Sequence, residues 1–214
     1  YKVVKKMKII IPARKGSKGV PFKNRELLLL TLETIPENIR SSCIISTDDD
    51  FIKKEAISLE FIVHDRTDDV SKDDSSMKQT INQVVKDFEI KEHVVVLLLT
   101  YPERTWLQVE EAYKFFIKKS AKSLLCRQDV LSHPYLCFYE LSDDKGKSVV
   151  GHSKYRRQDF PVCFHVRHMI CIFDAQELNK LNENLYNEDT AYYKIENTLD
   201  VDNQSEINLV RNRK

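Results

Sequence analysis

The sequence predicts an α/β fold with a mostly parallel sheet, and three observations support this fold class. Short apolar runs alternate with segments rich in helix formers from residue 7 to about residue 125. The run over 93–99 (HVVVLLL) is almost wholly β-branched or aliphatic, as expected of a central parallel strand buried on both faces. Polar residues follow these runs directly, at the strand ends where open α/β sheets bind ligands. A smaller β-rich excursion over 132–161 interrupts the alternation.

Length, net charge and cysteine content limit the classes of protein to which this chain can belong. The 214 residues suffice for one sizeable domain, so we expect residues 1–214 to form a single unit with 132–161 as an inserted arm. A net charge of +1 gives no electrostatic case for nucleic-acid binding. No run approaches the ~20 apolar residues of a membrane span, and the N-terminus has no leader-peptide pattern. Five cysteines without metal-ligand spacing predict buried free thiols in a reducing, cytoplasmic location.

The first strand, over 7–11, leads into a loop with unusual chemistry. Two of the four glycines of the chain, Gly16 and Gly19, stand in it among several lysines and arginines. Glycine allows a left-handed turn or a close approach of the backbone to a ligand, and backbone N–H groups with flanking cations bind anions. The spacing matches neither a Walker A loop nor GxGxxG. We expect a polyphosphate site here; the alternative is a basic surface turn.

The pattern predicts the rest of the fold in order. Up to residue 88 it indicates a helix over 27–35, a strand over 42–46, a helix over 51–58 capped by Asp49 or Asp50, a strand over 61–64, and an amphipathic helix over 77–88. Beyond residue 93 it indicates the strand over 93–99, a helix over 106–119, a strand over 123–125, a strand–turn–strand over 132–147, a strand over 163–173 and a last helix.

The loop also resembles the signature of a known family, the acylneuraminate cytidylyltransferases. The matched positions are Arg14, Gly16, Ser17, Lys18, Gly19, Pro21, Lys23 and Asn24. The resemblance implies a Rossmann-like nucleotide-diphospho-sugar transferase fold. It also implies that the nucleotide is bound by Ala13, Arg14, Gly16, Ser17, Lys18, Gly19, Lys23 and Asn24.

Two further motifs extend the resemblance toward the other end of the chain. Arg66, Asp73, Ser75 and Ser76 match a loop that helps to hold the cytidine in the family, although a solvated loop with a helix cap at Ser75 or Ser76 is an equally good interpretation. Near the C-terminus, Asp200 and Asp202 stand two apart on an extended segment, so their carboxylates point the same way. The family uses this pair for Mg²⁺ (or Mn²⁺), as suits carboxylate oxygens; the alternative is a polar strand edge.

On the side of the acceptor sugar, the chain both matches the family and departs from it. Arg104 and Arg157 fall on family motifs. In the family, the segment that corresponds to 132–161 is an arm that packs against a second subunit with its arginine reaching the phosphate or substrate site, so we expect a homodimer. Leu98 stands where the family has a sugar-contacting Gln, and Arg167-His168 stand where it has Asn-Gly. We therefore expect Leu98, Arg104, Arg157 and Arg167 at the acceptor, and a sugar other than N-acetylneuraminate.

The resemblance implies an activity: transfer of CMP from CTP to the anomeric hydroxyl of a nonulosonic, sialic-acid-like sugar, with release of pyrophosphate, for surface polysaccharide or glycan biosynthesis. The residues that it assigns to catalysis are Arg14, Lys23 and Asp202. Two alternatives remain open. One is a 3-deoxy-manno-octulosonate-type or other sugar nucleotidyltransferase of the same fold; the other is a nucleotide-binding homologue without activity.

Overall fold

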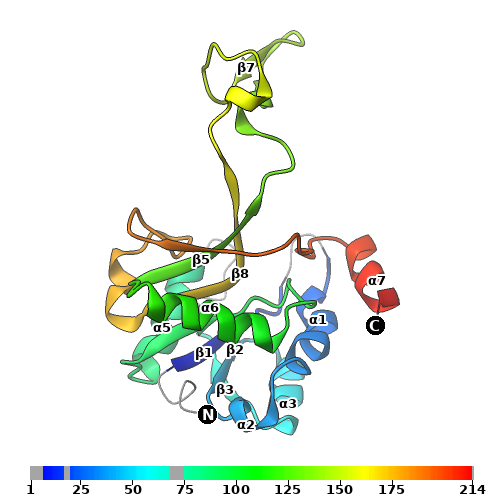
Figure 1. Ribbon diagram of the computed structural model, residues 1–214. Coiled ribbons are helices and arrows are strands. Elements are labelled where there is room, and N and C mark those ends of the chain that lie inside the picture. The colour runs from blue at the N-terminus through cyan, green and yellow to red at the C-terminus, as the bar shows by residue number, and fades with distance from the viewer. Residues whose placement is uncertain (1–6, 17–19, 68–74, 214) are drawn as a thin grey trace.

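The computed structural model describes residues 7–16, 20–67 and 75–213, and its body is one seven-stranded sheet covered by helices (Figure 1). The strand order is β3-β2-β1-β4-β8-β5-β9, and β8 alone runs antiparallel to both of its neighbours. The strands of this sheet are β1 Met7–Pro12, β2 Cys43–Thr47, β3 Ile62–Asp65, β4 His93–Val96, β5 Ser123–Asp129, β8 Phe164–Asp174 and β9 Ala191–Lys194. The α/β class with a mostly parallel sheet is confirmed.

Helices cover both faces of this sheet, as expected when the strands are apolar on both sides. The described α-helices are α1 Lys23–Leu32, α2 Glu37–Arg40, α3 Asp50–Ser58, α5 Met77–Asp87, α6 Trp106–Lys118 and α7 Gln204–Arg213. Buried side chains of α1, α3, α6 and α7 pack in one core cluster, whereas those of α5 and the 3₁₀ segment Ala175–Lys180 pack in the other. Alternate residues of β1 supply both clusters, Ile9 and Ile11 to one and Ile10 to the other.

Most predicted elements are confirmed to within a few residues, and the differences have physical causes. Helix α1 begins at Lys23 rather than at residue 27, because Phe22 turns the chain with a left-handed φ of 57°. The predicted strand over 93–99 ends at Val96. It is a central strand parallel to β1, as predicted, but it is antiparallel to its other neighbour, β8. Strand β9 was not predicted.

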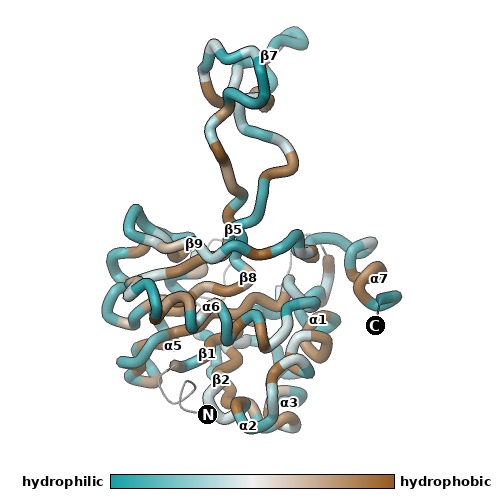
Figure 2. The backbone as a smooth tube through the Cα atoms, in the orientation of Figure 1, coloured by the Kyte–Doolittle hydropathy of each residue, from teal (hydrophilic) through white to brown (hydrophobic). Residues whose placement is uncertain are grey.

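The excursion forms an arm that rises away from the sheet between β5 and β8 (Figure 1). Its ordered parts are short: β6 Phe138–Glu140 pairs with β7 Gly146–Ser148, and 3₁₀ turns span Pro134–Leu136 and Arg157–Asp159. Figure 2 shows hydrophobic segments along the arm that the body does not cover. Gly146 lies directly against the Phe138 ring, and a Cβ there would make this exposed ring shift.

The cysteine prediction holds in part. All five thiols are free, and three of them, Cys43, Cys126 and Cys171, are buried. Burial raises the pKa of Cys43 and of Cys126 to about 12, so neither thiol forms a nucleophilic thiolate at neutral pH. No helix among the described residues is long and apolar enough to cross a membrane.

Candidate active site

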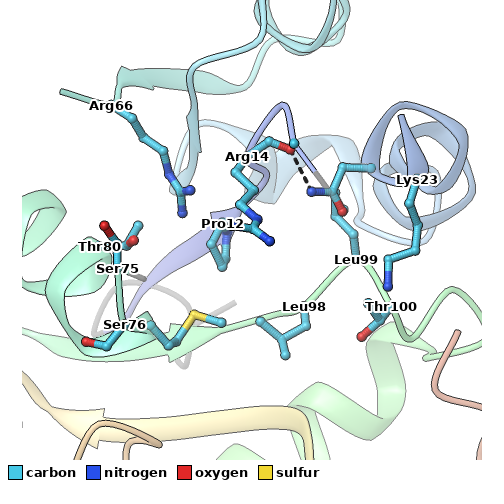
Figure 3. Close-up of a pocket in the computed structure, with 13 residues that line it drawn as sticks. Pro12, Arg14, Lys23, Arg66, Ser75, Ser76, Thr80, Leu98, Leu99 and Thr100 are labelled. Carbon is cyan, nitrogen blue, oxygen red and sulfur yellow. Dashed lines mark hydrogen bonds between the residues drawn. The ribbon is translucent and has the colours of Figure 1, made fainter. Parts of the chain in front are cut away.

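A pocket of about 320 Å³ opens where the strand order reverses, beyond the carboxyl ends of β1 and β4 (Figure 3). The chain builds β1, β2 and β3 outward in one direction and then returns to β4 on the other side of β1. Such switch points are where open α/β sheets bind ligands. The lining residues are Pro12, Arg14, Gly16, Lys23, Asn24, Arg66, Ser75, Ser76, Met77, Thr80, Leu98, Leu99 and Thr100.

The loop after β1 forms one wall of the pocket. Asn24 Nδ2 donates to the Arg14 carbonyl over 2.8 Å, which fixes the loop against the first turn of α1. Asp48 Oδ1 accepts from Lys15 N over 2.7 Å at the outer side of the same loop. Gly16 does not adopt a positive φ, so a left-handed turn does not explain its glycine. A Cβ at Gly16 would meet nothing within 4 Å. The backbone at Gly16 is therefore open to close approach by an anion.

Lys23 connects this loop to the C-terminal segment. Its Nζ donates to the Val201 carbonyl over 3.0 Å and lies 3.3 Å from Asp202 Oδ1. Val201 is buried, and its N–H donates to the Thr100 carbonyl. The Asp202 carboxylate is 75% exposed and lies next to Lys23 of the pocket lining, whereas the Asp200 carboxylate is only 29% exposed. Segments 179 residues apart in the chain meet at this ion pair.

Asp200 contacts two side chains, Tyr101 and Arg167, and the sequence analysis did not predict these contacts. Tyr101 donates its hydroxyl hydrogen to Asp200 Oδ2 over 2.7 Å. Burial and this hydrogen bond raise the pKa of Tyr101, so the phenol stays a donor. Arg167 Nη1 lies 4.0 Å from the same oxygen, and its Nη2 donates to the Thr198 carbonyl over 3.0 Å. Arg167 therefore places a positive charge near the Asp200 carboxylate, and it does not line the pocket.

The donor set at this place fits a hard divalent cation. Among the described residues, no group of three or more His, Cys, Asp and Glu side chains could hold a metal by itself. Mg²⁺, however, commonly takes one or two carboxylates and completes its shell with waters and substrate phosphates. Asp200 and Asp202 would supply those carboxylates if a cation binds here. Asp202 is 75% exposed, so its contact with Lys23 could be exchanged for one with another cation.

Arg66, Ser75 and Ser76 form the opposite end of the pocket (Figure 3). Burial lowers the pKa of Arg66 to about 10, so its guanidinium remains charged at neutral pH. Ser76 caps α5 by accepting from Gln79 N, in a complete capping box. The helix-cap interpretation is thus confirmed for Ser76, which also lines the pocket. Asp49 likewise caps α3 through Phe51 N, as favoured from the sequence.

Leu98 lines the pocket, whereas Arg104 stands behind it. Arg104 is 2% exposed, and its Nη1 donates to the carbonyls of Leu98 over 3.0 Å and of Met169 over 2.9 Å. Arg104 therefore supports the wall that presents Leu98, and it does not reach the pocket as the sequence led us to expect.

Several predicted site residues are not brought to the pocket. The side chain of Ala13 is fully buried, and its backbone is tied to β2 through Ser46 and Thr47. Arg157 lies exposed in the 3₁₀ turn Arg157–Asp159 of the arm and does not line the pocket. His168 points to the other face of β8 from Arg167, as successive strand residues must, and bonds the Asn184 carbonyl. Ser17, Lys18, Gly19 and Asp73 lie outside the described residues.

Other residues of the site escaped the sequence analysis. Thr80 and Met77 enter the pocket from the first turn of α5, and Pro12, Leu99 and Thr100 enter it from strand ends. Tyr101 is buried between Thr100 and Pro102, and neither neighbour indicates a partner 99 residues away. Only the rule that polar groups follow strand ends could have suggested Thr100.

Comparisons with known proteins agree with this picture. No protein-family model matches the chain. An N-acylneuraminate cytidylyltransferase of Streptococcus agalactiae is 29% identical over 212 residues, which cover 92% of this chain and 51% of that protein. A pseudaminic acid cytidylyltransferase of Campylobacter jejuni is 26% identical over 73% of each chain. The chain thus spans about half the length of the curated N-acylneuraminate cytidylyltransferases that it matches.

Two solved structures share the fold over nearly the whole chain. CMP-2-keto-3-deoxy-manno-octonic acid synthetase, solved with CTP, has a TM-score of 0.68 at 12% identity, covering 97% of this chain and 98% of its own. The 4-diphosphocytidyl-2C-methyl-D-erythritol synthase of Anaerococcus prevotii has a TM-score of 0.67 at 12% identity, covering 100% and 98%. At this identity the likeness concerns the fold alone. In sequence the chain is similar to N-acylneuraminate and pseudaminic acid cytidylyltransferases, and it shares its fold with the two solved structures.

Proposed function

We propose that this chain transfers CMP from CTP to the anomeric hydroxyl of a nonulosonic acid sugar and releases pyrophosphate, in the biosynthesis of a surface polysaccharide or glycan. One observation carries the proposal. A single pocket at the switch point of the sheet collects Arg14, Gly16, Lys23, Asn24 and Arg66, and its Lys23 contacts Asp202. These are the residues that the resemblance assigns to the nucleotide and metal, and the similar proteins are cytidylyltransferases.

The nucleotide would lie along the pocket with its two ends in different surroundings. Arg14, Lys23 and the open backbone at Gly16 suit the triphosphate, because cations and N–H groups stabilise the charge that grows on phosphate oxygens. Arg66 and the Ser75–Ser76 end suit the base, since a pyrimidine is recognised by a few placed hydrogen bonds. Ser17, Lys18 and Gly19 are expected to complete the phosphate side.

The reaction itself is a displacement at the α-phosphorus. The anomeric oxygen of the sugar forms the new O–P bond, and the bond from the α-phosphorus to the pyrophosphate oxygen breaks. We assign the hydroxyl proton to Asp202, because Asp200 already accepts from Tyr101. Asp200 and Asp202 would hold Mg²⁺, which supplies positive charge against the phosphate oxygens. Leu98 and Arg167 would border the acceptor.

The arm is best explained by a second copy of the chain. Phe138 is 68% exposed, Tyr139 is 60% exposed and Tyr155 is 96% exposed, although large aromatic side chains of this kind normally bury most of their surface. Exposed apolar surface of this kind commonly marks an association site. A homodimer would cover it and could bring Arg157 to the acceptor side of the partner's pocket. A cytoplasmic location stays a prediction, which cell fractionation tests.

The activity is tested by measuring pyrophosphate release with CTP, Mg²⁺ and a panel of eight-carbon and nine-carbon acid sugars, with UTP and ATP as controls. We expect release with CTP and one nine-carbon sugar, and none after EDTA treatment. Release with the eight-carbon 3-deoxy-manno-octulosonate alone would favour that alternative, which the shared fold also allows. CTP binding without release from any sugar would favour the homologue without activity.

A further inference from the structure

A chain of hydrogen bonds runs from the pocket to the surface through three side chains that the proposed reaction does not use. Arg66 Nε donates to Ser46 Oγ over 3.2 Å, Ser46 Oγ lies 3.0 Å from His64 Nδ1, and His64 Nε2 lies 2.9 Å from Asp87 Oδ2. Ser46 is fully buried and His64 is 5% exposed, whereas the Asp87 carboxylate is half exposed. We call Ser46, His64 and Asp87 the relay.

The chemistry of these groups sets the direction of each bond. Arginine can only donate, so Ser46 Oγ accepts from Arg66 and keeps its own hydrogen for another acceptor. His64 Nδ1 is that acceptor when the imidazole proton is on Nε2, and Nε2–H then donates to the Asp87 carboxylate. Every member of the relay is satisfied in this arrangement, as buried polar groups require.

The position of Asp87 shows that the relay is more than a chance contact. Asp87 is the last residue of α5, where the helix dipole disfavours a negative charge. His64 offsets this by donating to it, and the Phe88 ring packs edge-on against the imidazole, with centroids 6.0 Å apart. Gln83 Nε2 of α5 donates to Thr67 Oγ1 over 3.0 Å. Helix α5 thus holds the chain on both sides of Arg66.

The consequence concerns how Arg66 presents itself to a ligand. With Nε occupied by Ser46, its terminal guanidinium nitrogens point into the pocket, as Figure 3 shows. Burial is the main cause that lowers the pKa of Arg66, while Asp48 raises it and Arg14, which lines the same pocket, lowers it less. Arg66 therefore has both an acid and a cation near it, and each of its rotamers changes its distance to both. The hydrogen bond behind Nε restricts Arg66 to one of these rotamers.

We infer that Ser46, His64 and Asp87 are positioning residues that lock the rotamer of Arg66 for the base end of a pyrimidine nucleotide. The effect on CTP rests on the proposed function, while the locking of Arg66 does not. A preorganised side chain binds more tightly because less conformational freedom is lost on binding. The relay is thus expected to act on nucleotide affinity and only through Arg66.

The binding test uses isothermal titration of CTP to the full chain. We expect Ser46→Ala and His64→Leu each to weaken binding about tenfold, the usual cost of losing a hydrogen bond to a charged group. In turnover assays, KM for CTP should rise while kcat stays within about twofold, because the relay acts on binding of the ground state. His64→Asn, whose amide oxygen can accept from Ser46, should recover most of the affinity.

The decisive comparison is a double-mutant cycle with Arg66→Ala. If the relay acts through Arg66, adding His64→Leu to Arg66→Ala costs no further affinity. The matched control is Asp65→Asn. Asp65 is the last residue of β3 and lies between His64 and Arg66 in the chain; its side chain is 75% exposed and pairs with Lys53 on the surface. The CTP affinity of this variant should equal that of the parent. Additive losses in the cycle would show that His64 merely stabilises the fold, and would overturn the inference.

A second readout does not depend on CTP. In ¹⁵N NMR spectra, the Nε–H of Arg66, assigned with Arg66→Lys, should exchange slowly in the parent and fast in Ser46→Ala. Ser46→Ala removes one oxygen only and carries the test even if His64→Leu does not fold. Unchanged exchange would overturn the inference whatever CTP does. Failure of the parent to bind CTP, with slow exchange retained, would instead reject the proposed function and leave the locked Arg66 established.

Discussion

The two sides of the candidate site differ in how completely one chain builds them. On the nucleotide side, Arg14, Lys23, Asn24 and Arg66 come from separate elements and converge on one pocket. On the acceptor side, Leu98 offers only carbon, and Arg157 lies away from the pocket on the arm. Under the proposed function, a single chain carries the nucleotide side of the pocket, and we expect the choice of sugar to depend on Leu98 and Arg167 or on a second copy of the chain.

The largest expected effect is at the phosphate end of the nucleotide side. Lys23→Ala should lower turnover with CTP by about 10²- to 10³-fold, because it removes a preorganised charge next to the transferred phosphate. Lys53→Ala is the control: Lys53 pairs with exposed acids and lies away from the pocket. Arg14→Ala should behave like Lys23→Ala, with circular dichroism unchanged. Parent-like turnover in both variants would end the assignment of the loop as a phosphate cradle.

The carboxylate pair joins the two sides, and its removal should be nearly as costly. We expect Asp200→Asn and Asp202→Asn each to lower the rate by at least ~10²-fold. EDTA should abolish parental activity, and added Mg²⁺ or Mn²⁺ should restore it. Tyr101→Phe, which removes the donor to Asp200 but no charge, should cost less than either. Full activity in EDTA would contradict the metal assignment.

Many of the residues that line the pocket could be predicted from the sequence, because their signal lies in one short segment of the chain. Arg14, Gly16, Lys23 and Asn24 lie within one short segment, so their spacing alone identifies them. The α/β fold was equally accessible, because apolar runs and helix caps such as Asp49 are local signals. Contacts between distant segments gave no such signal.

Three features show this limit. Tyr101 meets Asp200 across the molecule, and the Ser46–His64 contact joins two strands of the sheet. Arg104 matched a substrate motif, but its guanidinium is buried and holds two carbonyls. Motif spacing reports which residue is present, whereas only the packing decides which way the side chain points.

A smaller effect is expected at the acceptor wall. Leu98 cannot donate or accept, so a sugar group that would bond a Gln there is left unpaired, which typically costs about 1–3 kcal/mol. N-acetylneuraminate should therefore be a poor substrate, and Leu98→Gln should raise its kcat/KM about tenfold. Leu107→Gln, on the exposed face of α6, is the control. The comparison between the two sides fails if N-acetylneuraminate is the best acceptor of the parent by a wide margin.

Substitutions in the arm should have the smallest effect on CTP affinity. They therefore separate the nucleotide side from the acceptor side most clearly. Sedimentation equilibrium should give about twice 25.1 kDa for the parent. The double variant Phe138→Ser and Tyr139→Ser removes two exposed aromatic side chains, 68% and 60% exposed, and should shift the chain toward the monomer. CTP affinity should stay within about twofold, since no arm residue lines the pocket.

Turnover with the acid sugar should fall on dissociation and recover at high protein concentration, because Arg157 would then again be supplied by a partner. A parent that is monomeric and fully active would place the whole acceptor side within one chain.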